Sequence, residues 1–203
     1  RADSWAAPTH DALSEARRDD PGTPNLGAAD YAIREQAQSS FAAVGQAQNW
    51  HSDSGLKGIA LPFVFPFYGQ GYSEIFVSSR GWIDFELGGN DGRANSTSEL
   101  AARRRIAPLW ADVRTGAAGD DLYVATGVPG QITVRWDAAS QADNGPAAFA
   151  VTLFSDGRMR FDYGSGNANL SPTVGFSSGD GEHYLVASYS GRPSLANANS
   201  LDI

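Results

Sequence analysis

The sequence predicts an all-β protein: an antiparallel β-sandwich with a jelly-roll-like arrangement and an extended N-terminal arm. Three observations favour this fold class. From Tyr31 onward, short apolar runs alternate with turn signals rich in Gly, Asp and Ser. Within several runs, apolar residues recur at every second position, as in half-buried strands. After residue 30 the sequence contains no long helical pattern.

Length and composition favour one folded domain preceded by an arm. A chain of 203 residues with 41% hydrophobic content is large enough to bury a core of its own. Residues 1–29 contain few large apolar side chains, so we divide the chain into an arm over residues 1–29 and a β-sandwich domain over residues 30–203. Trp5 and Leu13 are expected to anchor the arm, either on its own sandwich or on a neighbouring molecule.

The segment LPFVFPFYGQGYSEIFVSSRGWIDF, residues 61–85, predicts three strands. Residues 61, 63, 65 and 67 are apolar and share one face of an extended chain, which indicates a core stripe. Pro62 and Pro66 share the other parity and remove two ladder donors from one side, so this strand is expected to lie at a sheet edge or to end in a bulge. A turn over residues 68–72 and a break at Gly81 separate it from strands through residues 75–77 and 82–85.

Two hairpins are predicted further along the chain. The first joins residues 121–125 and 131–136 around a Pro129-Gly130 turn, with residues 132, 134 and 136 pointing inward and residues 133 and 135 outward. The second has two alternative registers. A two-residue turn would place Arg160 and Asp162 on the apolar face, whereas a three-residue loop over 155–157 with a left-handed Gly157 keeps that face apolar. We therefore predict a type I turn with a G1 bulge.

The remaining strands are expected at residues 173–176, at residues 184–189 and near Leu201. In the three-residue register of the second hairpin, residue 153 pairs with 159, residue 151 with 161 and residue 149 with 163. Every one of these pairs is apolar or aromatic, which is the pattern of a strand pair facing a core.

Charge and composition exclude several classes of function. A net charge of −8 argues against a nucleic-acid partner, because phosphate binding needs a cationic field. The basic run over residues 103–105 is interpreted as part of a solvated loop. The absence of cysteine excludes disulfides and thiolate chemistry. No apolar run approaches the roughly 20 residues of a membrane span, and a chain beginning at Arg1 is expected to be a processed secreted protein or an excised fragment.

The sequence also favours a non-catalytic protein. Its three histidines do not form a metalloprotease motif, and no G-x-S-x-G elbow is present. A glycosidase would need two carboxylates about 5 to 10 Å apart, and several acidic residues lie on or near predicted strands. The alternation of side chains points Asp84 and Asp162 outward, and no pair stands out from the set Asp84, Glu86, Asp112, Asp137 and Asp162.

No cofactor is expected, and calcium is the one metal that the sequence leaves open. Asn90 and Asp91 in a long polar loop, or Asp120 and Asp121, offer the hard oxygen ligands that calcium prefers. Neither group has the spacing of a helix–loop–helix calcium motif, so an ordinary solvated loop is the preferred interpretation of both.

Tryptophans raise the alternative of a sugar-stacking platform. Trp110 and Trp136 are interpreted as core residues, whereas Trp82 shares parity with Asp84 and is the best candidate for exposure. Carbohydrate binding therefore stays open.

Ordered sequence blocks carry a resemblance to a known family. The blocks are the 61–85 segment, RIAPLWADV, ITVRWDA, FAVTLFSDGRMRFDYG and TVGFSSGDGEHYLVASY. Together they resemble a β-sandwich module of secreted bacterial proteins. That module is often appended to subtilisin-like proteases or set in surface proteins. The stretch IAPLWADV is also similar to the nidogen-type extracellular domain. The resemblance covers residues 31–203. It departs from the usual pattern at Arg80, where an Asn is expected before Gly81, and this puts only a turn in doubt.

The resemblance implies an extracellular, non-catalytic protein of adhesion, matrix assembly or enzyme attachment. We expect a bacterial surface protein that assembles with copies of itself, for example into a filament, through its arm and the edge strand that contains Pro62 and Pro66. The alternative is a carbohydrate- or protein-binding accessory domain of a secreted enzyme.

Overall fold

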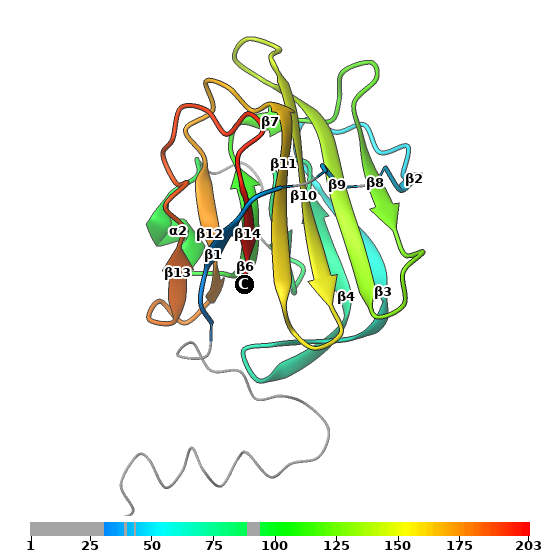
Figure 1. Ribbon diagram of the computed structural model, residues 1–203, viewed down its shortest axis with the longest axis vertical. Helices are drawn as coiled ribbons and strands as arrows, with labels where there is room; N and C mark the ends of the chain where they lie inside the picture. Colours follow the sequence, from blue (N-terminus) through cyan, green and yellow to red (C-terminus); the bar gives the residue numbers. More distant parts are fainter. Residues whose placement is uncertain (1–30, 39, 43, 89–93) are drawn as a thin grey trace, which may run out of the picture.

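The computed structural model describes residues 31–38, 40–42, 44–88 and 94–203, which form two antiparallel sheets packed face to face (Figure 1). The eight-stranded sheet consists of β1 (Arg34–Gln36), β2 (Gln46–Ala47), β7 (Val113–Arg114), β8 (Asp121–Ala125), β9 (Gln131–Ser140), β10 (Pro146–Phe154), β11 (Met159–Gly166) and β14 (Ser200–Asp202). The six-stranded sheet consists of β3 (Leu56–Phe67), β4 (Gln70–Ser78), β5 (Ile83–Asp84), β6 (Arg104–Trp110), β12 (Thr173–Ser178) and β13 (Tyr184–Val186). The predicted all-β sandwich is confirmed.

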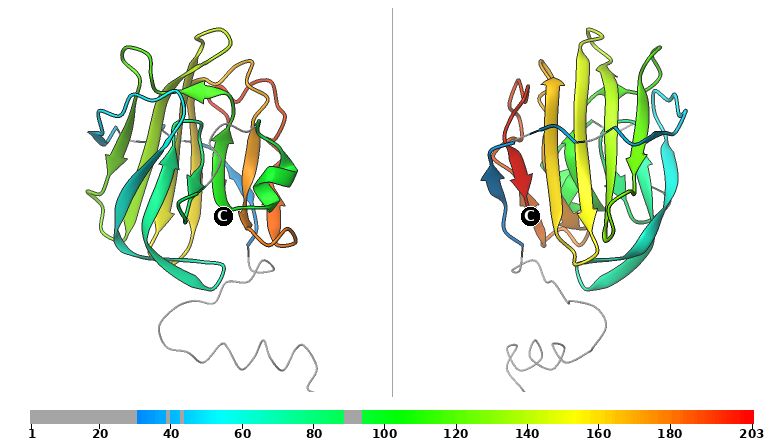
Figure 2. Two further views of the ribbon diagram at one scale, coloured as in Figure 1. Left: turned by 180° about the vertical axis from the view of Figure 1, so that it is seen from behind. Right: turned by 45° about the vertical axis from the view of Figure 1, so that its right-hand side comes forward.

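The strands of the larger sheet follow the order β1-β14-β11-β10-β9-β8-β2, with β7 also paired to β9. Those of the smaller sheet follow the order β13-β12-β6-β5-β4-β3. A short helix, α2 (Thr97–Ala101), is capped at its N-terminus by Ser96, whose hydroxyl accepts the backbone N–H of Glu99 at 3.1 Å. Figure 2 shows from two sides that the sheets form two layers and that α2 lies at the outside of the smaller one.

The main core fills the space between the sheets. Two of its aromatic residues, Trp136 and Tyr163, have a polar group that forms a hydrogen bond to the opposite sheet. The indole N–H of Trp136 on β9 donates to the carbonyl of Ser78 on β4 at 2.7 Å, and the hydroxyl of Tyr163 on β11 donates to the carbonyl of Pro108 on β6 at 2.9 Å. Both rings are fully buried, so these bonds satisfy polar atoms that have no access to water. They also connect one sheet directly to the other.

The second predicted hairpin has the predicted register. Leu153 pairs with Met159, Val151 with Phe161 and Phe149 with Tyr163. Gly157 has φ of +90°, and its N–H donates to the carbonyl of Phe154 at 2.9 Å. This register and the positive φ of Gly157 confirm the predicted three-residue loop. The loop is favoured because it keeps a single apolar face toward the core.

The first hairpin and the later strands also lie where they were expected. β8 and β9 pair around a turn in which Gly130 has φ of +75°. The strand predicted at residues 173–176 corresponds to β12, and the one near Leu201 corresponds to β14. β13 ends at Val186, three residues earlier than predicted.

β3 is the outermost strand of the six-stranded sheet, so the edge position predicted from its prolines is confirmed. Its pairing with β4 changes register between Ala60 and Phe65, as a bulged strand does. Phe65 and Phe67 are fully buried, and residues 61 and 63 pack against the same core, which confirms the core stripe.

Residues 37–45 connect opposite edges of the eight-stranded sheet, from β1 to β2, and we call their described part the crossing segment. It passes over the outer face of β11, β10 and β9 (Figure 1). The side-chain amide of Gln38 both donates to the carbonyl and accepts the N–H of Tyr163, at 3.0 Å each. Arg135 donates to the carbonyl of Ala42 at 3.0 Å, and its guanidinium stacks on the Phe41 ring. This part of the outer face is therefore covered by the protein itself.

Replacing Gly81 with alanine is expected to destabilise the fold severely. Gly81 has φ of +87°, and a Cβ there would lie 1.9 Å from the carbonyl oxygen of Leu109. Gly119 is the matched control, because it has φ of +94° but nothing within 4 Å of an added Cβ. In urea unfolding, Gly119→Ala should cost about 1 kcal/mol from backbone strain alone, whereas Gly81→Ala should cost more than about 3 kcal/mol. Equal losses would contradict the close approach at Leu109.

Candidate functional site

The first candidate surface is the free edge formed by β3. Within the described residues no strand pairs with the outer side of β3. Between Ala60, which pairs with Glu74, and Phe65, which pairs with Tyr72, residues 61–64 of β3 lie opposite only one residue of β4. Pro62 is exposed there, and Val64 is 56% exposed. Pro66, the second predicted interaction residue, is instead buried and pairs with Gly71.

The chain enters the sandwich beside one end of this free edge. Tyr31, the first described residue, is buried with its ring centroid 6.1 Å from that of Phe67, the last residue of β3, and 5.1 Å from that of Phe176 on β12. The Tyr31 hydroxyl accepts the backbone N–H of Tyr68 at 3.3 Å. Tyr31, the residue to which residues 1–30 are joined, therefore lies next to the β3–β4 turn. Trp5 and Leu13, the predicted anchors, lie outside the described residues.

The expectation that Trp82 is exposed is wrong. Trp82 is fully buried, and its ring and that of Trp110 lie on the guanidinium of Arg105, at 4.4 and 4.6 Å. Trp82 and Trp110 form a second apolar cluster with Ala107 and with Leu100 of α2. Trp82 does lie away from the main core, as its parity predicted. The helix covers this outer face, however, so a sugar-stacking role for Trp82 is not available.

The same cluster buries an ion pair. Arg105 donates to both carboxylate oxygens of Asp84, at 2.6 and 2.7 Å, and both side chains are nearly inaccessible to solvent. The interpretation of residues 103–105 as a solvated loop is therefore wrong for its last two members, which belong to β6. Arg104 donates to Gln70 and to the Tyr72 hydroxyl, at 2.6 Å each.

Each carboxylate considered for catalysis lies beside an arginine. Asp84 and Asp162 were predicted to point outward; both lie away from the main core, but they are paired with Arg105 and Arg160 and only 4% and 5% exposed. The shortest N–O distances in these pairs are 2.6 Å in Asp84–Arg105, 2.7 Å in Asp112–Arg80, 2.9 Å in Asp137–Arg135, 2.9 Å in Asp162–Arg160 and 3.9 Å in Glu86–Arg104. Each of these carboxylates is therefore already engaged by a charged partner within the protein.

Of the calcium candidates, Asp121 has a structural role. Its carboxylate accepts the backbone N–H groups of Asn49, Trp50 and Leu122 at 2.8, 2.9 and 2.7 Å. Burial raises the pKa of the neighbouring Asp120 carboxyl. The described residues contain no group of three or more His, Asp or Glu side chains placed to hold a metal ion. Asn90 and Asp91 lie outside them, so calcium binding in their loop stays a prediction.

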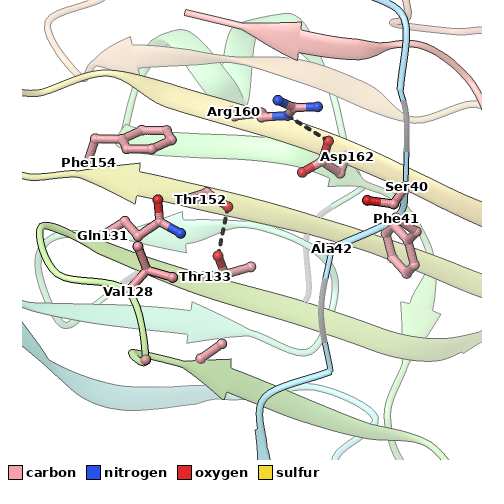
Figure 3. Close-up of a pocket in the computed structure, with 12 residues that line it drawn as sticks. Ser40, Phe41, Ala42, Val128, Gln131, Thr133, Thr152, Phe154, Arg160 and Asp162 are labelled. Carbon is pink, nitrogen blue, oxygen red and sulfur yellow. Dashed lines mark hydrogen bonds and ion pairs between the residues drawn. The ribbon is translucent and has the colours of Figure 1, made fainter.

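The second candidate surface is an open hollow of about 320 Å³ on the outer face of the eight-stranded sheet (Figure 3). The crossing segment borders it on one side and the β8–β9 turn on another. Its lining combines hydroxyl, amide, carboxylate and guanidinium groups with apolar side chains. The residues are Ser40, Phe41, Ala42, Ala125, Gly127, Val128, Gln131, Thr133, Thr152, Phe154, Arg160 and Asp162.

Polar pairs form the floor of the hollow. The hydroxyls of Thr133 and Thr152 are 2.8 Å apart, and both residues are buried. Arg160 Nε donates to Asp162 Oδ1 at 2.9 Å, and Asp162 also accepts the Ser200 hydroxyl. The outward direction predicted for Thr133 is right, although the residue is not solvated. Sequence reasoning missed this site, because its residues come from the crossing segment, the β8–β9 hairpin, β10 and β11 and share no motif.

Comparison with known families identifies a domain that covers most of the chain. A family model described as NIDO related matches residues 30–202, which include every described strand. No curated protein and no solved structure gives a significant match to the sequence. Among the described residues, no helix is long and apolar enough to cross a membrane.

Removing Asp84 is expected to destabilise the protein far more than removing an exposed partner. Asp84→Ala leaves Arg105 charged and buried, which should cost about 3–5 kcal/mol. The control is Asp156→Ala, because Asp156 pairs with Arg158 at 2.8 Å while both side chains are more than half exposed. That change should cost less than about 1 kcal/mol. Chemical denaturation of both variants measures the difference, and similar losses would contradict a structural role for the buried pair.

His183 is expected to titrate above the usual histidine range. Its Nδ1 contacts Asp180 Oδ2, and this hydrogen bond raises the pKa of the imidazole. Because the folded-state pKa is raised, the pair stabilises the fold below the unfolded pKa of about 6.5, and this contribution is lost as pH rises through the folded pKa. NMR titration should show a lower His183 pKa in Asp180→Asn. Glu182→Gln, which removes a nearby charge without this hydrogen bond, should lower it less; an unchanged pKa in Asp180→Asn would refute the assignment.

Proposed function

The chain belongs to the NIDO-related family, and on that basis we propose that it is an extracellular, non-catalytic structural module that assembles with copies of itself. In the proposed intermolecular contact, residues 1–29 of one molecule bind the free edge of β3 in the next molecule. The observation that carries this proposal is that Tyr31 lies beside the end of β3. The segment preceding Tyr31 therefore starts next to a strand whose outer side has no partner among the described residues.

Length supports this pairing. An extended chain spans about 3.3 Å per residue, so residues 1–29 reach up to about 100 Å, whereas the twelve residues of β3 span about 40 Å. The arm is long enough both to cross between molecules and to lie along a neighbour's edge. Strand addition uses backbone hydrogen bonds, which tolerate a polar sequence such as this arm.

The arginine-paired carboxylates support a non-catalytic role. A retaining or inverting glycosidase needs one carboxyl group with a raised pKa to donate a proton. All five candidates lie within 4 Å of an arginine nitrogen, so each already has a charged partner within the protein.

The hollow on the outer face supports a second candidate function, ligand binding. The hollow on the eight-stranded sheet favours a ligand-binding accessory domain, and such a role is compatible with either a monomer or a polymer.

Deleting residues 1–29 should abolish self-assembly and leave the sandwich folded. Light scattering and negative-stain images of the full chain should show polymers, and the truncated chain should be monomeric. Polymers that persist after truncation would refute the role of the arm, and a monomer in both forms would favour the accessory-domain function.

A charge on the free edge should weaken assembly without unfolding the protein. Val64→Lys places a solvated cation where the added strand would pass, as natural edge strands do to prevent pairing. Val44→Lys is the control, because Val44 on the crossing segment is 57% exposed against 56% for Val64. The first variant should assemble at least about tenfold less than the second. Equal assembly of the two variants would contradict an intermolecular contact at the free edge of β3.

A further inference from the structure

We propose that the hollow on the outer face of the eight-stranded sheet binds a neutral saccharide of one or two sugar units. Its volume of about 320 Å³ lies at the lower end of the range of about 300–1,000 Å³ for small-molecule sites. This inference goes beyond the proposed assembly, because the hollow lies on the eight-stranded sheet and the free edge belongs to the six-stranded one.

The charges of the hollow favour a neutral ligand. Asp162 and Arg160 are the charged residues of its lining and pair with each other at 2.9 Å, and Arg160 also lies 3.9 Å from Asp202 outside the lining. An anion therefore meets no unpaired cation in the hollow, and a cation meets no unpaired carboxylate there. Asp162 is 5% exposed, and only its Oδ1 accepts hydrogen bonds from described residues, so Oδ2 is left as an acceptor. Arg160 uses Nε and Nη2 toward Asp162 and Ser200, which leaves Nη1 as a donor. A sugar hydroxyl both donates and accepts, and it can therefore use both atoms.

The threonine pair adds a second point of recognition. In the hydrogen bond between Thr133 and Thr152 only one hydroxyl donates to the other, so the accepting hydroxyl keeps its own proton for a ligand. The side-chain amide of Gln131 points toward this pair in Figure 3 and forms no hydrogen bond with the described residues. An unpaired amide beside a free hydroxyl proton suits neighbouring hydroxyl groups on one sugar ring.

Apolar side chains complete the site. Val128 of the β8–β9 turn and Phe154 at the end of β10 border the hollow, and Phe41 borders it on the crossing segment (Figure 3). The Arg135 guanidinium stacks on Phe41, which holds that ring in place. Sugar rings present C–H groups on their faces and hydroxyls at their edges. A floor of polar groups with apolar walls matches that distribution, whereas a purely apolar ligand would leave the floor unpaired.

The first experiment uses the full-length, isotope-labelled Val64→Lys protein, because this variant is expected to assemble weakly and Val64 lies outside the hollow. It is titrated with maltose, cellobiose, lactose and N,N′-diacetylchitobiose, and its amides are followed by NMR. At least one sugar should give saturable shifts at millimolar or lower concentration, largest for the amides of Gln131, Thr133, Thr152 and Asp162. Sodium sulfate and putrescine, an anion and a cation, should not compete. The proposal is overturned if no sugar binds, if the shifts lie elsewhere, or if either ion displaces the sugar.

Variants then connect the binding to the hollow. Thr133→Val/Thr152→Val removes both partners of a hydrogen bond with groups of the same shape, which leaves folding nearly unchanged. This double variant and Gln131→Ala should each weaken sugar binding at least tenfold, while Gln46→Ala, a change on the exposed strand β2, should have no effect. Thermal unfolding confirms that each variant is folded. Unchanged affinity in folded Gln131→Ala and in the folded double variant would refute the site.

Discussion

The hydrogen bond from Trp136 to Ser78 across the core holds much of this structure in place. It joins the middle of the eight-stranded sheet to the last residue of β4. The N–H of Ser78 in turn donates to the carbonyl of Trp82 at 2.8 Å, which closes the turn that contains Gly81. That turn brings Gly81 against Leu109 on β6 and directs Trp82 onto Arg105. The inner core and the outer cluster are therefore linked through one short segment.

Arginine explains how an acidic protein of this size buries carboxylates on both outer faces. Asp84 is held by Arg105, which lies against Trp82 and Trp110, and Asp162 is held by Arg160 beside the crossing segment. In both pairs the arginine donates through Nε. The planar guanidinium also stacks on aromatic rings, as it does on Trp82, Trp110 and Phe41. Lysine could form neither the bidentate bond nor the stack, which accounts for the use of arginine at these positions.

The two sheets provide different surfaces for function. The six-stranded sheet ends in a long bulged strand next to the attachment point of the arm, an arrangement suited to joining molecules. The eight-stranded sheet has its outer face crossed by its own chain, and this crossing turns part of a flat sheet into a hollow with a polar floor. Assembly and ligand binding would thus use separate parts of one extracellular module.

The sequence by itself determined the sandwich, the edge position of β3 and the register of the β10–β11 hairpin. Each of these follows from local rules: alternation decides which face is apolar, proline removes ladder donors, and Gly157 accepts a left-handed turn. Those rules place a side chain on one face of a sheet but do not say what covers that face. Trp82, Asp84 and Asp162 were therefore assigned correctly to the outer side and wrongly given an open surface.

Only the tertiary structure decided what lies over the two outer faces. Leu100 of α2 covers Trp82. The side chain of Gln38 on the crossing segment forms hydrogen bonds with the backbone N–H and C=O of Tyr163 on β11. These contacts join residues up to 125 positions apart, and the hollow likewise gathers side chains from distant segments. No local period or motif in the sequence predicts these contacts between distant residues. They depend on how α2 and the crossing segment pack onto the outer faces of the sheets.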